Sequence, residues 1–143
     1  MRIADILRSK GNSVATVSPS ATLADLIGEL ARHNVGALPV VDDGGRLVGI
    51  VSERDVVRQL HEHGPEVLGV PIAEFMTATV TTCSPSDKVA DLARVMTTGR
   101  FRHLPVVVDG SLAGIVSIGD LVKSRISELE GERDDLVGYI GNR

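Results

Sequence analysis

The chain is poor in aromatic residues and has almost no cysteine. Aromatic side chains make up 2% of its 143 residues, and tryptophan is absent. Val, Ile, Leu and Ala must therefore build the core. Cys83 is the only cysteine, so the chain can form neither an internal disulfide nor a zinc site of several cysteines. We expect a reducing, cytoplasmic setting.

Dense basic runs and long apolar runs are also missing. The net charge is −4, which argues against duplex nucleic acid as a partner, because such binding relies on many Lys and Arg contacts to phosphates. No apolar run approaches the ~18 residues that span a bilayer. Residues 1–13 are too charged to resemble a secretory signal. The sequence therefore predicts a cytoplasmic protein without a membrane partner.

Familiar catalytic signatures are missing as well. The chain has no glycine-rich phosphate loop, no H-E-x-x-H and no G-x-S-x-G. His61 and His63 are two residues apart and cannot share a helix face, which argues against a metal pair. Cys83 aligns with Val17 in a predicted strand, which favours a small core residue over a nucleophile. These patterns indicate a protein that is not an enzyme.

What the chain does contain is an internal repeat. Residues 14–41 and 80–107 are identical at twelve of 28 positions when the chain is shifted by 66 residues. LVGIVSERDVV at 47–57 and LAGIVSIGDLV at 112–122 then match at seven of eleven positions, at a shift of 65. The segments 3–7 and 72–76, which precede the repeats, also correspond. The chain therefore consists of two copies of one unit.

Each copy predicts the same elements. A short lead-in helix comes first, and a strand follows at 14–17 in the first copy and at 80–83 in the second. A Ser-Pro-Ser turn then opens a helix over 23–33 and over 88–98. Gly36 and Gly99 lie near the ends of these helices. Two apolar runs around a polar turn (42–45; 109–110) predict a hairpin, and a second helix follows Ser52 and Ser117. The fold class is α/β (α+β), with two β-α-β-β-α repeats packed sheet to sheet.

This pattern divides the chain into three segments. Residues 1–64 form the first repeat with its lead-in helix, residues 65–123 form the second repeat, and residues 124–143 form a helical tail. Residues 61–70, which contain glycine and proline, are expected to link the repeats. Ile126, Leu129, Leu136 and Ile140 give the tail an apolar stripe that suits packing on the domain or on a second subunit.

The Ser-x-x-Asp motif that ends each apolar run has two interpretations. Ser52 with Asp55, and Ser117 with Asp120, fit a capping box, in which each side chain accepts a hydrogen bond from a free backbone N–H. The motif also places a helix N-terminus at the edge of a sheet, where a phosphate binds well. A carboxylate there could accept hydrogen bonds from the two hydroxyls of a ribose, as in dinucleotide-binding folds. The recurrence of the motif favours the second interpretation.

A Leu-Pro-Val run precedes each of these motifs. Proline removes a ladder donor, so Pro39 and Pro105 indicate either a protected edge strand or backbone groups left free to read a flat base. The second copy adds Arg100, Arg102 and His103, which could neutralise phosphates. The two predicted pockets therefore differ in charge.

The repeats, each with S-P, an apolar helix, L-P-V-V and G-I-V-S-x-x-D, resemble a tandem cystathionine-β-synthase (CBS) domain pair, the Bateman module, of the small stand-alone bacterial type. The resemblance implies two intertwined units with pseudo-twofold symmetry, and clefts between them that bind AMP, ADP, ATP, NAD(H) or S-adenosylmethionine. It also implies a homodimer. Matched residue by residue, it assigns ligand binding to Thr16, Ala37, Leu38, Pro39, Ser52, Arg54, Asp55, Thr82, Arg100, Arg102, His103, Leu104, Pro105, Ser117 and Asp120.

Within this assignment the two aspartates would hold ribose hydroxyls, and the two serines would contact ribose or phosphate. The first repeat lacks counterparts of Arg102 and His103, so its phosphate contacts must be borrowed across the interface or be absent. The resulting hypothesis is a non-catalytic sensor of adenosine ligands, without a catalytic cofactor, that acts on an unknown regulated protein. The rival hypothesis is a dimerising scaffold with vestigial pockets.

Overall fold

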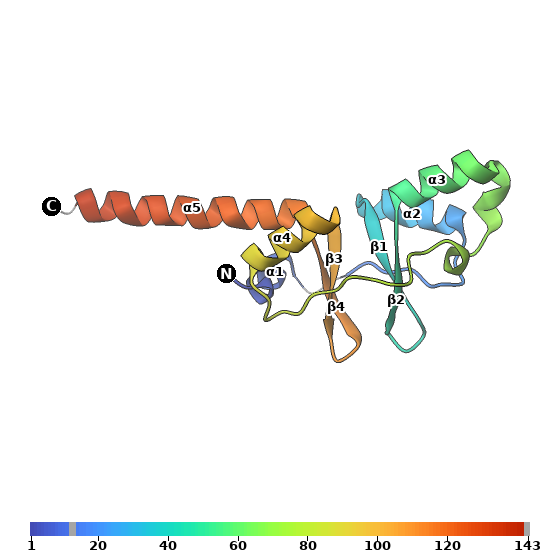
Figure 1. The fold of residues 1–143 in the computed structure, drawn as a ribbon, viewed down its shortest axis with the longest axis horizontal. Helices are drawn as coiled ribbons and strands as arrows, with labels where there is room; N and C mark the ends of the chain where they lie inside the picture. The colour runs from blue at the N-terminus through green and yellow to red at the C-terminus, as the bar shows by residue number, and fades with distance from the viewer. Residues whose placement is uncertain (12–13, 142–143) are drawn as a thin grey trace.

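The computed structural model describes the backbone of residues 1–11 and 14–141, and side chains up to residue 138. Two short antiparallel hairpins lie near the middle of the molecule, with helices around them (Figure 1). The elements in chain order are α1 (Ile3–Lys10), α2 (Leu23–His33), β1 (Ala37–Val41), β2 (Leu47–Ser52), α3 (Glu53–His63), η1 (Pro65–Gly69), η2 (Ile72–Glu74), α4 (Val89–Gly99), β3 (His103–Val108), β4 (Ser111–Ser117) and α5 (Ile118–Gly141). The mixed helix-and-strand fold class is confirmed.

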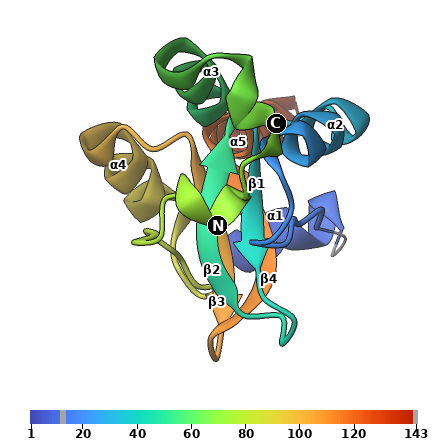
Figure 2. The same cartoon turned by 90° about the vertical axis from the view of Figure 1, so that its right-hand side faces the viewer.

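The hairpins follow the predicted pattern. β1 pairs with β2, and β3 with β4, in the same register, so that Pro39 lies opposite Ile50 and Pro105 opposite Ile115. Asp109 and Gly110 form the turn of the second hairpin with φ of 51° and 81°. Two successive positive φ values suit a two-residue turn between twisted strands. The two hairpins stand side by side in Figures 1 and 2, and a backbone bridge joins Arg46 to Ser111.

The strands predicted over 14–17 and 80–83 are wrong. Each is reduced to one residue, Val17 or Cys83, that bridges in parallel to the neighbouring hairpin. The Val17 N–H donates to the carbonyl of Pro39, and the Val41 N–H donates to the carbonyl of Val17. The Ser-Pro that follows each bridge prevents the pairing from extending further along the chain, because proline has no N–H for a ladder. Residues 14–16 and 80–82 precede the bridges and lie outside the pairing.

Two predicted helix signals also differ from the structure. The Ser-Pro-Ser segments form turns ahead of α2 and α4, and Thr22, not a serine, caps α2 through a hydrogen bond from the Asp25 N–H. At the helix ends, the left-handed residues are Asn34 and Arg100 instead of the neighbouring glycines. Asn tolerates this conformation because its short polar side chain can bond locally, whereas nothing in the structure explains the choice of Arg100.

The lead-in segments are exchanged between the repeats. Ile3, Ile6 and Leu7 of α1 belong to the core of the second repeat, whereas Val67 and Ile72 belong to the core of the first. Matching hydrogen bonds hold both segments: the Ile3 N–H donates to Asp87 O, and the Ile72 N–H donates to Ala21 O. The exchange ties the repeats together by packing as well as by chain connectivity.

In each exchanged segment, one apolar side chain packs closely against a glycine in the hairpin of the other repeat. A Cβ at Gly114 would lie 2.6 Å from Cδ2 of Leu7, and a Cβ at Gly49 would lie 2.6 Å from Sδ of Met76. These glycines occupy the same place in β4 and β2, so each hairpin receives one apolar side chain from the lead-in of the other repeat. A side chain at either position would force the Leu7 or Met76 side chain to shift, so glycine allows this close packing.

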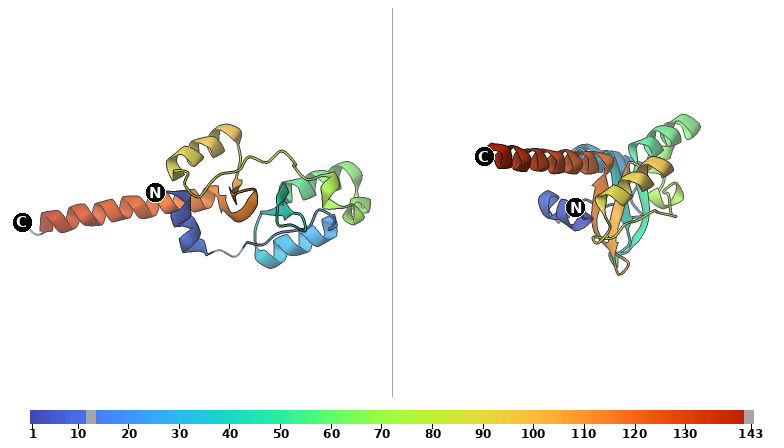
Figure 3. Two further views of the ribbon diagram at one scale, coloured as in Figure 1. Left: turned by 90° about the horizontal axis from the view of Figure 1, so that it is seen from below. Right: turned by 60° about the vertical axis from the view of Figure 1, so that its left-hand side comes forward.

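Two further segments differ from simple linkers. Residues 61–63 continue α3, and η1 follows with Val67 buried, so this part of the chain packs against the first repeat. α5 runs without a break across the predicted boundary at residue 124 and projects from the rest of the molecule (Figures 1 and 3). The segment boundaries 1–64, 65–123 and 124–143 stay a prediction.

Candidate functional site

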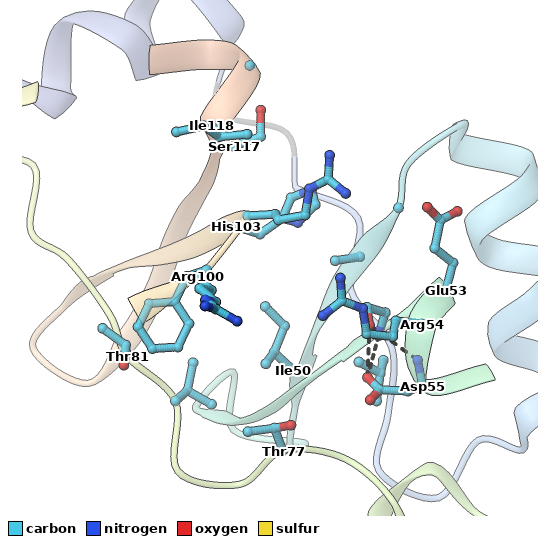
Figure 4. A pocket seen from close by; sticks show the side chains of 18 of the residues that line it. Ile50, Glu53, Arg54, Asp55, Thr77, Thr81, Arg100, His103, Ser117 and Ile118 are labelled. Carbon is cyan, nitrogen blue, oxygen red and sulfur yellow. Dashed lines mark hydrogen bonds between the residues drawn. The ribbon is translucent and has the colours of Figure 1, made fainter. Parts of the chain in front are cut away.

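A cavity of about 610 Å³ lies between the two repeats. The end of β2 and the start of α3 form one side, and the approach to β3 together with the start of α5 forms the other (Figure 4). The segment between the repeats completes it. The lining residues are Gly36, Ala37, Ile50, Val51, Ser52, Glu53, Arg54, Asp55, Thr77, Thr79, Val80, Thr81, Arg100, Phe101, Arg102, His103, Ser117, Ile118 and Gly119.

The cavity brings together about half of the residues predicted from the sequence. Those that line it are Ala37, Ser52, Arg54, Asp55, Arg100, Arg102, His103 and Ser117. The others do not line it: Thr16, Leu38, Pro39, Thr82, Leu104, Pro105 and Asp120. Leu38, Pro39, Leu104 and Pro105 are buried in the repeats. Thr16 lines a separate hollow beside α2. The roles of all these residues stay predictions.

Asp55 and Ser52 form the capping box that the sequence allowed. The Ser52 backbone N–H donates to Oδ2 of Asp55 over 2.8 Å, the Ser52 hydroxyl donates to the same oxygen over 3.1 Å, and the Asp55 N–H donates to the Ser52 hydroxyl over 3.4 Å. Within the described part of the chain, Oδ1 of Asp55 accepts no hydrogen bond from the protein. The capping bonds therefore fix the carboxylate while leaving one oxygen for a ligand hydroxyl.

The second repeat supplies the positive charge of this cavity. Arg100 and Arg102 follow α4, yet they face the first repeat's Asp55 across the space, where Arg54 adds a third guanidinium. In Figure 4, Arg54 and Arg100 lie on opposite sides of Ile50. Basic residues of the second repeat thus line the same cavity as the acidic motif of the first, and that they supply its phosphate contacts stays a prediction. Three arginines against Glu53 and Asp55 favour an anionic ligand.

His103 stands between the two repeats and is half-buried. Burial lowers the pKa of its imidazole from the ordinary value of 6.5, and the charges of Arg102 and Lys10 lower it further, against the opposing effects of Asp120 and Glu53. At neutral pH the ring is therefore neutral and can either donate or accept a hydrogen bond.

The lowered pKa of His103 predicts a loss of stability on acidification. The unfolded chain binds a proton at His103 at higher pH than the folded chain, so stability falls as pH drops through about 6.5 and levels off below the folded pKa. Thermal melts from about pH 7.5 to 5 should show a smaller decline for His103→Gln than for the parent chain. His61→Gln, an exposed control on α3 for which the structure shows no side-chain hydrogen bond among the described residues, should keep the parent's decline; equal slopes for all three would contradict the prediction.

The second acidic motif has a different environment. The Ser117 N–H donates to Oδ2 of Asp120 over 2.8 Å, as in the first motif, but Nζ of Lys10 donates to the same oxygen, also over 2.8 Å. Burial raises the pKa of Asp120, while the hydrogen bonds from Lys10 and Ser117 outweigh it and lower the pKa overall. The two aspartates, alike in sequence, therefore differ in their hydrogen-bond partners.

Sequence reasoning missed the threonine-rich segment that crosses the cavity. Thr77, Thr79 and Thr81 line it, and Thr77 pairs its backbone with Ile50 through two hydrogen bonds of 3.0 Å. Alternate threonines in Thr77-Ala-Thr-Val-Thr were the available signal, because alternation places like side chains on one face of an extended segment. Ile50 and Phe101, also missed, give the cavity apolar surface for a flat base.

Other candidates lie outside the site. Cys83 is buried in the second core, and burial raises the pKa of its thiol to about 12, which confirms a core position. Among the described residues no cluster of three His, Cys, Asp or Glu side chains could hold a metal ion. In the same part of the chain, no helix has the length and apolar character needed to cross a bilayer.

Two repeats of helix, hairpin and helix with a cavity between them define a paired-repeat module. The chain belongs to the CBS domain family, whose family model matches residues 3–62 and again residues 72–127. CBS-domain pairs are generally regulatory.

Three similar proteins illustrate the relationship. The mitochondrial CBS domain-containing protein CBSX3 of Arabidopsis thaliana is 35% identical over 96% of this chain and 71% of its own length. The crystal structure of the CBS-domain protein ATU1752 of Agrobacterium tumefaciens is 40% identical, with a TM-score of 0.84 over 87% of this chain and 99% of that one. CBSX2, solved in complex with AMP, is 30% identical, with a TM-score of 0.75 over 88% of this chain and 96% of that one.

Proposed function

We propose that the chain is a non-catalytic sensor that binds one anionic adenosine ligand, of the class of AMP, ADP, ATP or NAD(H), in the cavity beside Asp55. The observation that carries the proposal is the meeting of a ribose acceptor, Asp55, with Arg54, Arg100 and Arg102 around one space. The volume of about 610 Å³ lies within the range of ~300–1,000 Å³ that small-molecule sites occupy.

Each part of such a ligand has a matching surface. Oδ1 of Asp55 can accept hydrogen bonds from ribose hydroxyls, and the start of α3 offers a helix N-terminus to a phosphate. The guanidinium groups can neutralise the phosphate, while Ile50 and Phe101 can contact the base. The excess of arginine disfavours the sulfonium cation of S-adenosylmethionine, because like charges repel at close range. AMP in CBSX2 is consistent with this class.

A thermal-shift panel with AMP, ADP, ATP, NAD⁺, NADH and S-adenosylmethionine tests the proposal. A ligand at ~100 times its dissociation constant stabilises the folded chain by about 2.7 kcal/mol, which raises the melting temperature by roughly 8 °C for a domain of this size. We expect a shift with at least one phosphate-containing ligand and a smaller shift with S-adenosylmethionine. If none of the six shifts the melting temperature, the module is a scaffold and the sensor proposal fails.

We further propose that the sensor works as a cytoplasmic homodimer that acts on a separate regulated protein. Support for a second copy comes from α5, where Val122, Ile126, Leu129 and Leu136 are 48–60% exposed. With Arg133, these residues follow one another at alternating steps of four and three, the spacing of a coiled-coil seam. The helix projects into solvent (Figure 3), so a partner helix can reach the seam.

Charges beside the seam favour a parallel pair of α5 helices. In the parallel arrangement, Arg125 of one copy faces Glu130 of the other, and Arg133 lies beside the other copy's Glu132. In an antiparallel pair centred on the same seam, glutamates of one helix would face glutamates of the other, and their like charges would repel. A second copy of this chain therefore fits the seam through both apolar spacing and charge.

A further inference from the structure

The two acidic motifs differ because a side chain of the protein already occupies one of them. Nζ of Lys10 donates to Oδ2 of Asp120 over 2.8 Å and to the backbone carbonyl of Ile115 over 2.9 Å. The side chains of Lys10 and Asp120 are 38% and 22% exposed, so the pair is partly shielded from water. Partial burial reduces the screening of this pair relative to a surface pair.

Lys10 is held in place by the exchanged lead-in helix. It is the last residue of α1, and Leu7, one turn earlier, is packed over Gly114 in the second core. Hydrogen bonds from the N–H groups of Ile3 and Ala4 to the carbonyls of Asp87 and Pro85 anchor the other end of the helix. The ammonium group therefore reaches Asp120 from a rigid base.

The first motif lacks such a cation because its lead-in has a different backbone. When the lead-in segments are aligned at their shift of 69 residues, Thr79 corresponds to Lys10. The 3-10 helix η2 ends at Glu74, and an extended segment then carries Thr79 to the wall of the open cavity beside Asp55. α1 instead stays helical as far as Lys10. One repeat thus presents a neutral hydroxyl at its acidic motif, and the other presents an ammonium group on the carboxylate.

From this difference we infer that Lys10 closes the second motif to ligands, so each chain takes up one adenosine ligand at Asp55 and none at Asp120. Among the described residues Oδ1 of Asp120 accepts no hydrogen bond, like Oδ1 of Asp55, but the ammonium group on Oδ2 neutralises the charge of the carboxylate and so weakens it as an acceptor for ribose hydroxyls. Ribose hydroxyls carry no charge, so they cannot replace the attraction between Lys10 and Asp120. Lys10 is therefore a specificity-determining residue that makes two similar motifs unequal.

Removal of the ammonium group should open the second site. Lys10→Thr installs the residue found at the corresponding place in the open cavity, and Lys10→Met keeps the apolar stem without the charge. Arg8→Met is the matched control, because Arg8 is an exposed cation on the same helix that pairs with Asp5 instead of Asp120. Circular dichroism and melting curves show whether each variant folds.

Isothermal titration with AMP, ADP, ATP and NAD⁺ provides the test, which rests on the proposed function. We expect one ligand molecule per parent chain and per Arg8→Met chain, and two per chain in at least one folded Lys10 variant. Adding Asp120→Ala to that variant should return the stoichiometry to one ligand molecule per chain. If two ligand molecules bind per parent chain, or if only one binds per chain in both Lys10 variants, the inference is overturned while the proposed function stands. No binding to the parent chain by any of the four overturns both.

Discussion

Replacing Asp55 with Asn is expected to remove most of the stabilisation that an adenosine ligand gives to the chain. The asparagine keeps the shape of the side chain and an acceptor oxygen, but it loses the negative charge that strengthens hydrogen bonds from ribose hydroxyls. Loss of a hydrogen bond to a charged group costs about 1.5–3 kcal/mol, which weakens binding roughly 10- to 100-fold. At a ligand concentration that stabilises the parent by about 2.7 kcal/mol, a 100-fold weaker variant gains only about 0.4 kcal/mol.

The measurement is the difference between melting temperatures with and without ligand, because the substitution also affects the folded chain itself. Asp55 accepts the backbone N–H of Ser52, so the ligand-free variant is expected to melt earlier than the parent. Asp25→Asn is the matched control: Asp25 holds the same position in the capping box of α2, away from the cavity. It should lower the melting temperature while keeping the full ligand shift. A full shift in Asp55→Asn would refute the assignment of ribose binding to Asp55.

Replacing Leu129 with Glu is expected to convert the proposed homodimer into monomers. Leu129 lies in the middle of the α5 seam, so a symmetric pair would bury two facing glutamates there. Desolvation and like-charge repulsion should cost about 4 kcal/mol, which raises the dimer dissociation constant roughly a thousandfold. Glutamate forms helices well, so α5 itself should persist.

Light scattering after size-exclusion chromatography measures this effect directly. The parent chain should show twice the mass of one 15.1 kDa chain, and Leu129→Glu should show the single mass at the same concentration. Ser127→Glu adds the same charge on an exposed position of α5 away from the seam, and it should stay dimeric. A dimeric Leu129→Glu variant would place the interface elsewhere, and a monomeric parent would refute the homodimer.

Features that depend on neighbours in the sequence could be predicted from the sequence. The hairpin turn at Asp109-Gly110 follows from two residues that adopt positive φ readily. The capping box of Ser52 and Asp55 follows from their spacing of three residues at the start of a helix. The failed strands at 14–17 and 80–83 show the limit, because the number of residues that pair depends on the partner strand.

The composition of the site needed the tertiary structure. Arg100 and Arg102 are adjacent in sequence to the second repeat's hairpin, yet packing of the repeats places them opposite Asp55 of the first. The alternation of threonines at 77, 79 and 81 indicates that they share one face, but they line the cavity only because the connecting segment crosses between the repeats. Contacts between residues far apart in the chain carry no local pattern.

The sequence by itself determined that this protein is a duplicated unit with a Ser-x-x-Asp motif in each copy, because identical residues at a fixed shift require similar local structure. Only the tertiary structure decided how the surroundings of the two aspartates differ. Lys10 and Asp120 are separated by 110 residues, and they meet because α1 packs into the second core. That exchange of lead-in segments is a consequence of long-range apolar packing, which determines the surroundings of each aspartate.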